Sequence, residues 1–274
     1  MNKTIYIILI TLTATLGFAR VNYNIPYVEV LPTYDGVLQA GEWDDALSIA
    51  ISYEDLVTNG SGADVLGSTP ASSDISGTYY FKWDEDFLYM AFDVTDDIQV
   101  WRNSYPGSYN GQDDVQVCFN PFDDPAAVFM TDAWIFDFAA ETSDLYGPDV
   151  YRHTGDIFVD PNMIASTLET DGYVIEVALS WKDISSEITA KAGDYHGFGL
   201  MIVDVDSSTA ESLLCDFGEG VNVISNPAQW NILHLVDSKG CGSVGRLSAD
   251  INADCYVDLS DFVMMTSDWM ESSF

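Results

Sequence analysis

The feature that most constrains the fold is a series of short segments in which apolar and polar residues alternate. Residues 78–83 and 87–94 are rich in aromatic and β-branched residues, and Asp84-Glu85-Asp86 between them is typical of a hairpin turn. Residues 114–120 alternate apolar and polar residues, which predicts a half-buried strand, and further strands are predicted at residues 133–138, 173–179, 198–205 and 230–236. Residues 180–188 predict one short helix. Many strands with few helices predict an all-β, antiparallel β-sandwich of jelly-roll or immunoglobulin-like form.

The N-terminus has the layout of a secretory signal peptide. Lys3 precedes an apolar run over residues 5–18, and Gly17 and Ala19 suit a small-residue cleavage site. The run is short and interrupted by threonine, and no second apolar run of membrane length follows. We therefore expect residues 1–19 to be removed. The mature chain, from Arg20, is expected to be secreted, extracellular or on the cell surface, without membrane insertion.

The charge of the chain excludes one class of partner. A formal net charge of −35 repels polyanions, so we expect no nucleic-acid binding. The chain is not a disordered acidic tail, because hydrophobic residues make up 47% of it. This apolar content suffices for one domain of about 200 residues.

Residues 250–261 carry oxygen ligands at the spacing of a calcium loop. With Asp250 as position 1, side-chain oxygens fall at positions 1, 3, 5, 9 and 12, and position 7 offers a backbone carbonyl. Val257 at position 8 is expected to pack inward, and a helix is expected from Ser260. The predicted Ca²⁺ ligands are Asp250, Asn252, Asp254, Tyr256, Asp258 and Asp261.

This loop and helix resemble a dockerin repeat. The resemblance implies a partner of the cohesin-like receptor type, or use of the repeat as an attachment tag. A dockerin normally has two repeats and a glycine at position 6, whereas this chain has one repeat and Cys255 there. We therefore predict a small C-terminal calcium loop-helix unit, a dockerin-like calcium-binding repeat, over residues 250–274. Residues 238–249, which contain Gly240, Gly242 and Gly245, are its predicted linker.

Four cysteines permit two disulfides in an exported chain. We favour Cys241 with Cys255, which would tie the calcium loop to the preceding segment. Cys118 and Cys215 would then link two strands, or both are buried thiols. The sequence has no Cys-x-x-Cys spacing, so it does not support a zinc site.

Several motifs, in order, resemble family 9 carbohydrate-binding modules over roughly residues 30–237. They are Asp35-Gly36-Val37 with residues 41–46, residues 83–84 with 88–96, residues 113–117 with Gln116 where glutamate is commoner, residues 172–181, and the strand at 197–206. The resemblance implies a carbohydrate-binding β-sandwich over residues 25–237, without catalysis. It implies a polysaccharide or oligosaccharide ligand, a plant-type polysaccharide such as xylan or β-glucan, together with an aromatic clamp and structural calcium.

The motifs do not locate the clamp, so side-chain chemistry indicates the candidates. Sugar rings stack their C–H faces on aromatic rings, and their hydroxyls bind planar polar groups. One loop supplies both kinds: Trp101, Arg102, Asn103, Tyr105, Tyr109, Asn110 and Gln112. Trp134 and Trp230 are candidates for an opposing ring, although Trp230 suits the core better. Trp43, Trp83 and Trp181 are predicted to fill the core.

Other functions remain open. The chain could be a structural scaffold that binds no sugar, or an accessory part of a glycoside hydrolase system with hydrolase activity. No carboxylate stands in a recognisable catalytic motif, and we read Glu176 as outward-facing and structural or calcium-linked. Met90 with His153 or His196 would be the ligands of a haem domain. The acidic strand ends, at Asp93, Asp96, Asp97, Asp113 and Asp114, either hold calcium or simply face water.

Overall fold

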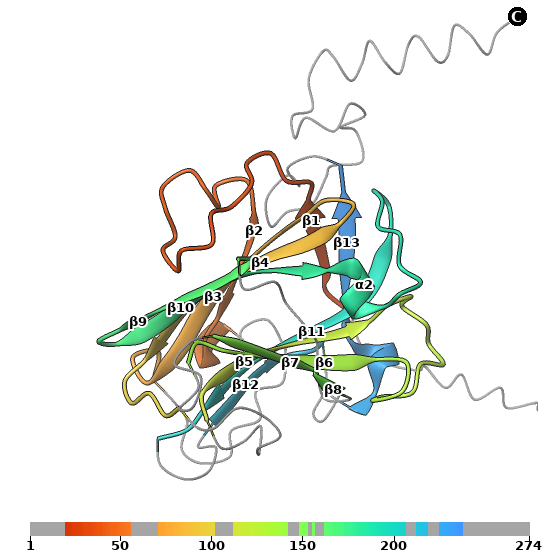
Figure 1. The fold of residues 1–274 in the computed structure, drawn as a ribbon. Helices are drawn as coiled ribbons and strands as arrows, with labels where there is room; N and C mark the ends of the chain where they lie inside the picture. Colours follow the sequence, from red (N-terminus) through yellow and green to blue (C-terminus); the bar gives the residue numbers. More distant parts are fainter. Residues whose placement is uncertain are drawn as a thin grey trace, which may run out of the picture.

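The computed structural model describes residues 20–55, 71–101, 112–141, 148–152, 155–156, 162–206, 212–218 and 225–237. Two β-sheets lie one over the other (Figure 1), and the described helical stretches are short, at residues 53–55, 181–184 and 227–229. The described chain is therefore an all-β sandwich, as the sequence predicts.

The smaller sheet has five strands in the order β2-β3-β4-β10-β9, all antiparallel. The larger sheet has the order β1-β13-β11-β5-β6-β7-β8, and β12 pairs with β11 beyond the end of β13. Within it, β1 runs parallel to β13. The strands are β1 (Asn22–Pro26), β2 (Leu47–Ile51), β3 (Ile75–Trp83), β4 (Phe87–Asp96), β5 (Asp114–Asn120), β6 (Trp134–Ala139), β7 (Asp149–Arg152), β8 (Gly155–Asp156), β9 (Ile164–Glu169), β10 (Gly172–Ser180), β11 (Tyr195–Asp204), β12 (Ser212–Asp216) and β13 (Asn231–Val236).

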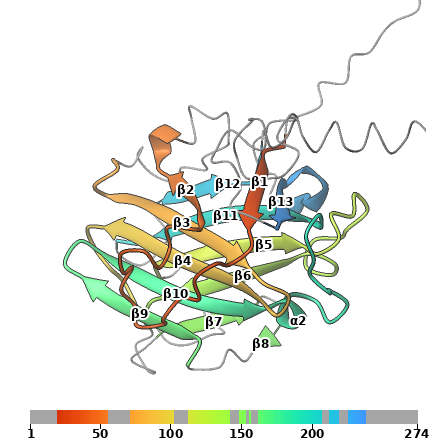
Figure 2. The ribbon, with the colours of Figure 1, turned by 90° about the horizontal axis from the view of Figure 1, so that it is seen from above.

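Seen from above, the strands of the smaller sheet overlap those of the larger sheet (Figure 2). The core lies between the sheets and is built from alternate residues of facing strands. Rings from both layers meet there: Phe81 of β3 and Phe119 of β5 both contact Phe198 of β11, with centroids 5.3 and 5.7 Å away. Trp43, Trp83 and Trp181 are 6%, 2% and 1% exposed, which confirms the prediction that they pack inside. Trp181 begins the short helix α2 (Trp181–Ile184), which is shorter than the predicted helix.

All seven predicted strands are present, with boundaries shifted by a few residues. The prediction that residues 114–120 form a half-buried strand is wrong, since every residue of β5 is buried. The reason is that both faces of β5 are covered: one by the smaller sheet, the other by a second apolar cluster that includes Cys118, Met201 and Trp230. The sequence analysis missed β1, β2, β7, β8, β9 and β12.

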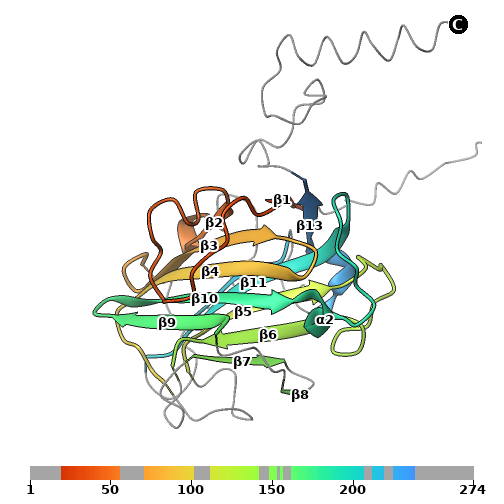
Figure 3. The same ribbon diagram turned by 45° about the horizontal axis from the view of Figure 1, so that its top comes forward.

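The outer face of the smaller sheet is partly covered by a segment that we call the strap, residues 28–46. It crosses the outer face of β3, β4 and β10 in front of the sheet (Figure 3). Trp43 of the strap packs with Tyr89, Ala91 and Ala178 in a third apolar cluster.

Two buried charged residues of the sheet anchor the strap. Glu176 accepts hydrogen bonds from Trp43 Nε1 at 2.9 Å and from the backbone N–H of Gly36 at 2.9 Å. Lys82 Nζ donates to the Glu42 carbonyl at 2.6 Å and pairs with Asp45 at 3.0 Å. Glu176 is thus structural, on the outer face, but buried under the strap rather than facing water.

Cys118 and Cys215 are buried thiols and not halves of a disulfide, so the cross-link that the sequence allowed between them is absent. They lie in the same apolar cluster, on β5 and β12. Cys241 and Cys255 lie outside the described residues, as do the signal peptide, the linker and the calcium loop. None of the helices in the described ranges has the length and hydropathy of a membrane span.

Candidate functional site

The predicted sugar-contacting loop leaves the sandwich between β4 and β5. Its base is closed by hydrogen bonds between Val100 and Asp113: the Val100 N–H donates to the Asp113 carboxylate, and the Asp113 N–H donates to the Val100 carbonyl at 3.1 Å. Trp101 is half-buried and forms a T-shaped contact with Tyr173, with the ring centroids 5.2 Å apart. Arg102, Asn103, Tyr105, Tyr109 and Asn110 lie outside the described residues.

The other sugar-site candidates are not brought together with Trp101. Gln112 is buried at the loop base, 3% exposed. Trp134 is half-buried at the start of β6, with the Arg152 guanidinium 5.5 Å from its ring centroid. Trp230 is completely buried and contacts Phe129 and Phe217, so its rings offer no face to a sugar. Its core role, which the sequence favoured, is confirmed.

Aspartates gather at the same end of the sandwich as the loop base. Carboxylate oxygens of Asp74, Asp97 and Asp206 all lie within 4.8 Å of one another. They come from the turn before β3, the end of β4 and the end of β11. Three hard oxygen donors at this separation fit a divalent cation such as calcium. The sequence analysis named Asp97 but missed Asp74 and Asp206, which only the fold brings beside it.

Two further aspartates are buried next to this group. Asp113 accepts from the Val205 N–H at 2.7 Å, and Asp96 Oδ1 accepts from the Ile98 N–H at 2.9 Å. Asp96 Oδ2 is buried against the Asp113 carboxylate, and a hydrogen bond can form there only when one of the two carries a proton. Burial raises the pKa of both carboxyls above their ordinary range, and nearby carboxylates add to the effect: Asp206 and Asp97 for Asp96, and Asp96 for Asp113.

A polar pair on the outer face of the larger sheet was also missed. Gln116 of β5 and Asp137 of β6 are register partners, and both are buried. Gln116 Nε2 donates to Asp114 at 3.1 Å, whereas its Oε1 is buried without a hydrogen-bond partner. Polar residues at alternate positions of β5 were the sequence signal, but the alternation suggested a solvated face.

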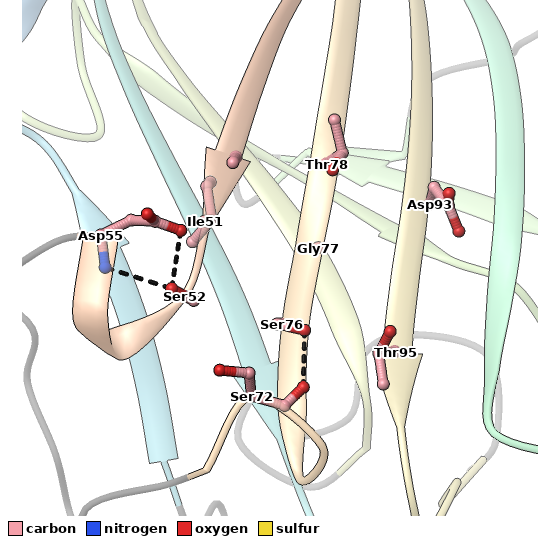
Figure 4. A pocket seen from close by; sticks show the side chains of 10 residues that line it. Ile51, Ser52, Asp55, Ser72, Ser76, Gly77, Thr78, Asp93 and Thr95 are labelled. Atoms are coloured by element: carbon pink, nitrogen blue, oxygen red, sulfur yellow. Dashed lines mark hydrogen bonds between the residues drawn. The ribbon is translucent and has the colours of Figure 1, made fainter.

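The part of the smaller sheet that the strap leaves uncovered holds a shallow polar groove with a volume of about 300 Å³. Figure 4 shows Thr78, Asp93 and Thr95 standing on β3 and β4, with Ser52 and Asp55 across from them. The Ser76 hydroxyl donates to the Ser72 carbonyl at 2.7 Å (Figure 4). The groove is lined by hydroxyls and carboxylates and has no aromatic ring.

The proposed haem ligands lie in different surroundings. Met90 is completely buried in the apolar core between the sheets. His196 stacks on Trp181 with centroids 5.4 Å apart, and its Nδ1 bonds the Pro121 carbonyl. Burial lowers the pKa of His196. His153 lies outside the described residues.

Two stacked sheets, with candidate residues on a loop at one sheet end, define a β-sandwich module. The chain belongs to the carbohydrate family 9 binding domain-like family, whose model matches residues 35–238. This confirms the family resemblance seen in the sequence motifs, including the order of the strap, the β3–β4 hairpin and β10.

Solved structures of low sequence identity share the fold. A family 9 carbohydrate-binding module from Caldicellulosiruptor kristjanssonii, in complex with cellotriose, superposes with a TM-score of 0.58 at 17% identity, over 79% of this chain and 94% of that one. A family 9 module from the same organism, in complex with glucose, superposes with a TM-score of 0.54 at 16% identity, over 79% of this chain and 96% of that one. A putative carbohydrate-binding protein from Bacteroides uniformis superposes with a TM-score of 0.52 at 7% identity, over 79% of this chain and 100% of that one. No curated protein sequence matches the chain.

Proposed function

We propose that this protein is a non-catalytic carbohydrate-binding module that takes a neutral polysaccharide, such as xylan or a β-glucan. The observation that carries the proposal is the family match over residues 35–238. Solved modules of the same fold were obtained with cellotriose and with glucose, which supports a glucan as ligand. The net charge of −35 favours a neutral polymer over an anionic one.

The proposed sugar site is the loop that starts at Trp101. Trp101 is the one member of the loop whose ring is described and partly exposed. Its T-shaped contact with Tyr173 fixes the ring without covering it completely. Such an arrangement reduces the conformational entropy that ordering the ring on binding would cost. Arg102, Asn103, Tyr105, Tyr109 and Gln112 would supply polar and aromatic contacts around it.

Affinity electrophoresis tests this site. The mature chain should be retarded in gels that contain xylan or a β-glucan, and Trp101→Ala should remove the retardation. Trp134→Ala is the matched control, because it removes another half-buried indole away from the loop. Equal loss in both variants, or none in either, would contradict the assignment to the loop.

Calcium is the proposed cofactor, at two places. The first is the predicted loop with Asp250, Asn252, Asp254, Tyr256, Asp258 and Asp261. The second is the cluster of Asp74, Asp97 and Asp206, whose mutual repulsion a divalent ion would relieve. A bound ion would hold together the turn before β3 and the ends of β4 and β11. It would thereby support the base of the Trp101 loop.

Thermal unfolding with calcium and with a chelator tests the second calcium site. A ligand that binds only the folded chain raises the unfolding temperature by mass action. We expect the unfolding temperature of the unchanged chain to be lower in chelator than in calcium. In the double variant Asp74→Asn, Asp97→Asn, most of this difference between the two conditions should disappear. If the double variant keeps the full difference, the calcium effect belongs elsewhere, for example to residues 250–261.

We further propose that the chain is secreted and that its C-terminal repeat serves assembly or attachment, with a cohesin-like receptor as one such partner. The signal-peptide layout and the calcium-loop spacing support this. Pull-down with a cohesin module, with and without calcium, tests it. Capture that persists after Asp250→Ala and Asp254→Ala would contradict a role for the loop.

A further inference from the structure

A second aromatic surface lies at the far end of the larger sheet from the Trp101 loop. Asn24 of β1, His234 of β13 and Tyr195 of β11 are successive register partners, so they stand in one row on the same face. The face is the outer one, because the neighbouring residues Leu233 and Leu235 point into the core. We call this row the β11 platform.

The rings of the β11 platform are already fixed in place. Tyr195 and His234 stack with their centroids 4.2 Å apart and their planes only 5° from parallel. His234 Nδ1 is in turn hydrogen-bonded to the Asn24 side-chain oxygen at 2.9 Å. Tyr195 still has 48% of its surface exposed, although the stack covers one face of its ring. The exposed part is therefore the opposite face and the ring edge.

The chemistry of this surface selects its ligand. An exposed aromatic face binds the C–H face of a pyranose, and the Asn24 amide, whose oxygen is engaged by His234, keeps N–H donors for a sugar hydroxyl. Gly197, the next residue of β11 on the same face, adds no side chain beside the ring. A single exposed tyrosine is common on protein surfaces. Here one face of the ring is stacked on His234, which Asn24 holds in place, and this reduces the entropy cost of binding.

We propose that the β11 platform is a second contact site for a neutral polysaccharide. The proposal rests on the carbohydrate-binding function proposed above and adds a separate surface to it. From Tyr195 to Asp204, at the end of β11 near Asp113, the strand spans about 30 Å, at roughly 3.3 Å per residue. One long polymer chain could therefore contact both ends of the sheet, whereas a trisaccharide could contact only one.

Two contacts on one polymer raise its apparent affinity through effective concentration, without changing affinity for a short ligand. Tyr195→Ala should therefore weaken retardation by the polymer about tenfold or more, whereas titration with cellotriose at the Trp101 loop should be unchanged. Tyr195→Phe keeps the ring and should behave as the unchanged chain does. Leu168→Ala is the control for loss of an exposed apolar side chain elsewhere, since Leu168 is 42% exposed.

The outcomes separate this proposal from the function on which it rests. If the unchanged chain binds polymer and Tyr195→Ala binds it equally well, the β11 platform is wrong and the proposed function stands. If Tyr195→Ala weakens polymer and cellotriose to the same extent, the platform is not a separate site. If the unchanged chain binds neither ligand, the proposed function itself fails. A circular dichroism melt of each variant confirms that the exposed substitutions leave the fold intact.

Discussion

At the scale of single residues, Lys82 of β3 is the side chain that holds the strap to the sheet at the most points. It is completely buried, and its ammonium donates to the Val30 carbonyl at 2.6 Å as well as to Glu42 and Asp45. It also lies 4.8 Å from the centroid of the Trp43 ring. Burial lowers the pKa of Lys82, and the bonds to Asp45 oppose this. One cation thus ties three points of the strap to the sheet.

Lys82→Met should therefore destabilise the protein strongly. The substitution keeps the apolar part of the side chain but removes the ammonium, so Asp45 Oδ1 and two carbonyls lose their donor. Breaking a buried charge pair in this way costs about 3–5 kcal/mol. Denaturation by urea measures the loss. Lys191→Met is the control, because Lys191 is exposed and its replacement should change stability by less than about 0.5 kcal/mol. An effect of Lys82→Met as small as the control's would contradict the role of Lys82 in holding the strap.

Asp96 is the second residue for which we predict a specific effect, here on the pH dependence of stability. Because burial raises the folded-state pKa of Asp96 and Asp113, the folded chain holds a proton more tightly than the unfolded chain. This tighter proton binding stabilises the folded chain. The stabilisation is complete below a pH of about 4 and is lost as pH rises through the raised pKa values of the two carboxyls. In chelator, Asp96→Asn removes the repulsion and places an N–H donor against Asp113.

We expect Asp96→Asn to raise the unfolding temperature in chelator at pH 8 by roughly 2–8 °C, which corresponds to about 1–2 kcal/mol. Its stability should also depend less on pH between about 5 and 9 than that of the unchanged chain. Asp44→Asn, at an exposed carboxylate, controls for the loss of one negative charge. A steeper pH dependence in Asp96→Asn than in the unchanged chain would contradict this account of the Asp96–Asp113 pair.

At the scale of elements, the start of β10 depends on Gly172. Its φ of +152° is favourable only for glycine, and a β-carbon there would lie 1.9 Å from the Val94 carbonyl oxygen. Gly172 therefore allows β10 to approach β4 closely enough for their register. Gly193 also has a positive φ, of +91°, but a β-carbon there would meet open space. It therefore shares the positive φ of Gly172 without a close contact like that between Gly172 and Val94.

Gly172→Ala should destabilise the fold by at least about 2 kcal/mol more than Gly193→Ala, which costs only about 1 kcal/mol for positive φ. Urea unfolding of the two variants measures the difference. Equal losses would show that the contact with Val94 is relieved by a small shift of the backbone, and that close approach is not what requires glycine at this position.

The strands that could be predicted from the sequence are those with strong alternation or aromatic content, such as β3, β4 and β10. Short edge strands such as β1 and β9 were missed, because half-exposed edges carry mixed residues with no clear period. Tertiary contacts also overrode local patterning: Gln116 and Glu176 have polar side chains on outer faces of the sheets, yet both are buried, Gln116 on the face that carries the second apolar cluster and Glu176 under the strap. No local pattern signals such cover.

The candidate site was less predictable than the fold. Trp101 was found because it stands in a polar, aromatic loop, whereas the aspartate cluster joins Asp74, Asp97 and Asp206 from distant parts of the chain. The β11 platform likewise requires β1, β13 and β11 to be neighbours, and β1 was not predicted. Sites assembled from several strands need the topology, which single-sequence periodicity does not supply.

At the scale of the whole molecule, the sandwich separates three surfaces. The strap covers part of the outer face of the smaller sheet, the Trp101 loop and the aspartate cluster share one end, and the β11 platform lies toward the other. A binding module of this kind needs no catalytic centre. We therefore expect binding of polysaccharide without release of reducing sugars from it.

The most direct test of the central claim is calorimetric titration of the mature chain with cello-oligosaccharides and xylo-oligosaccharides, in calcium. The proposed function predicts saturable binding of at least one series, with no new reducing ends after prolonged incubation. Absence of binding heat for every oligosaccharide, together with unretarded migration through every polysaccharide gel, would contradict it and favour a scaffold that does not contact sugar.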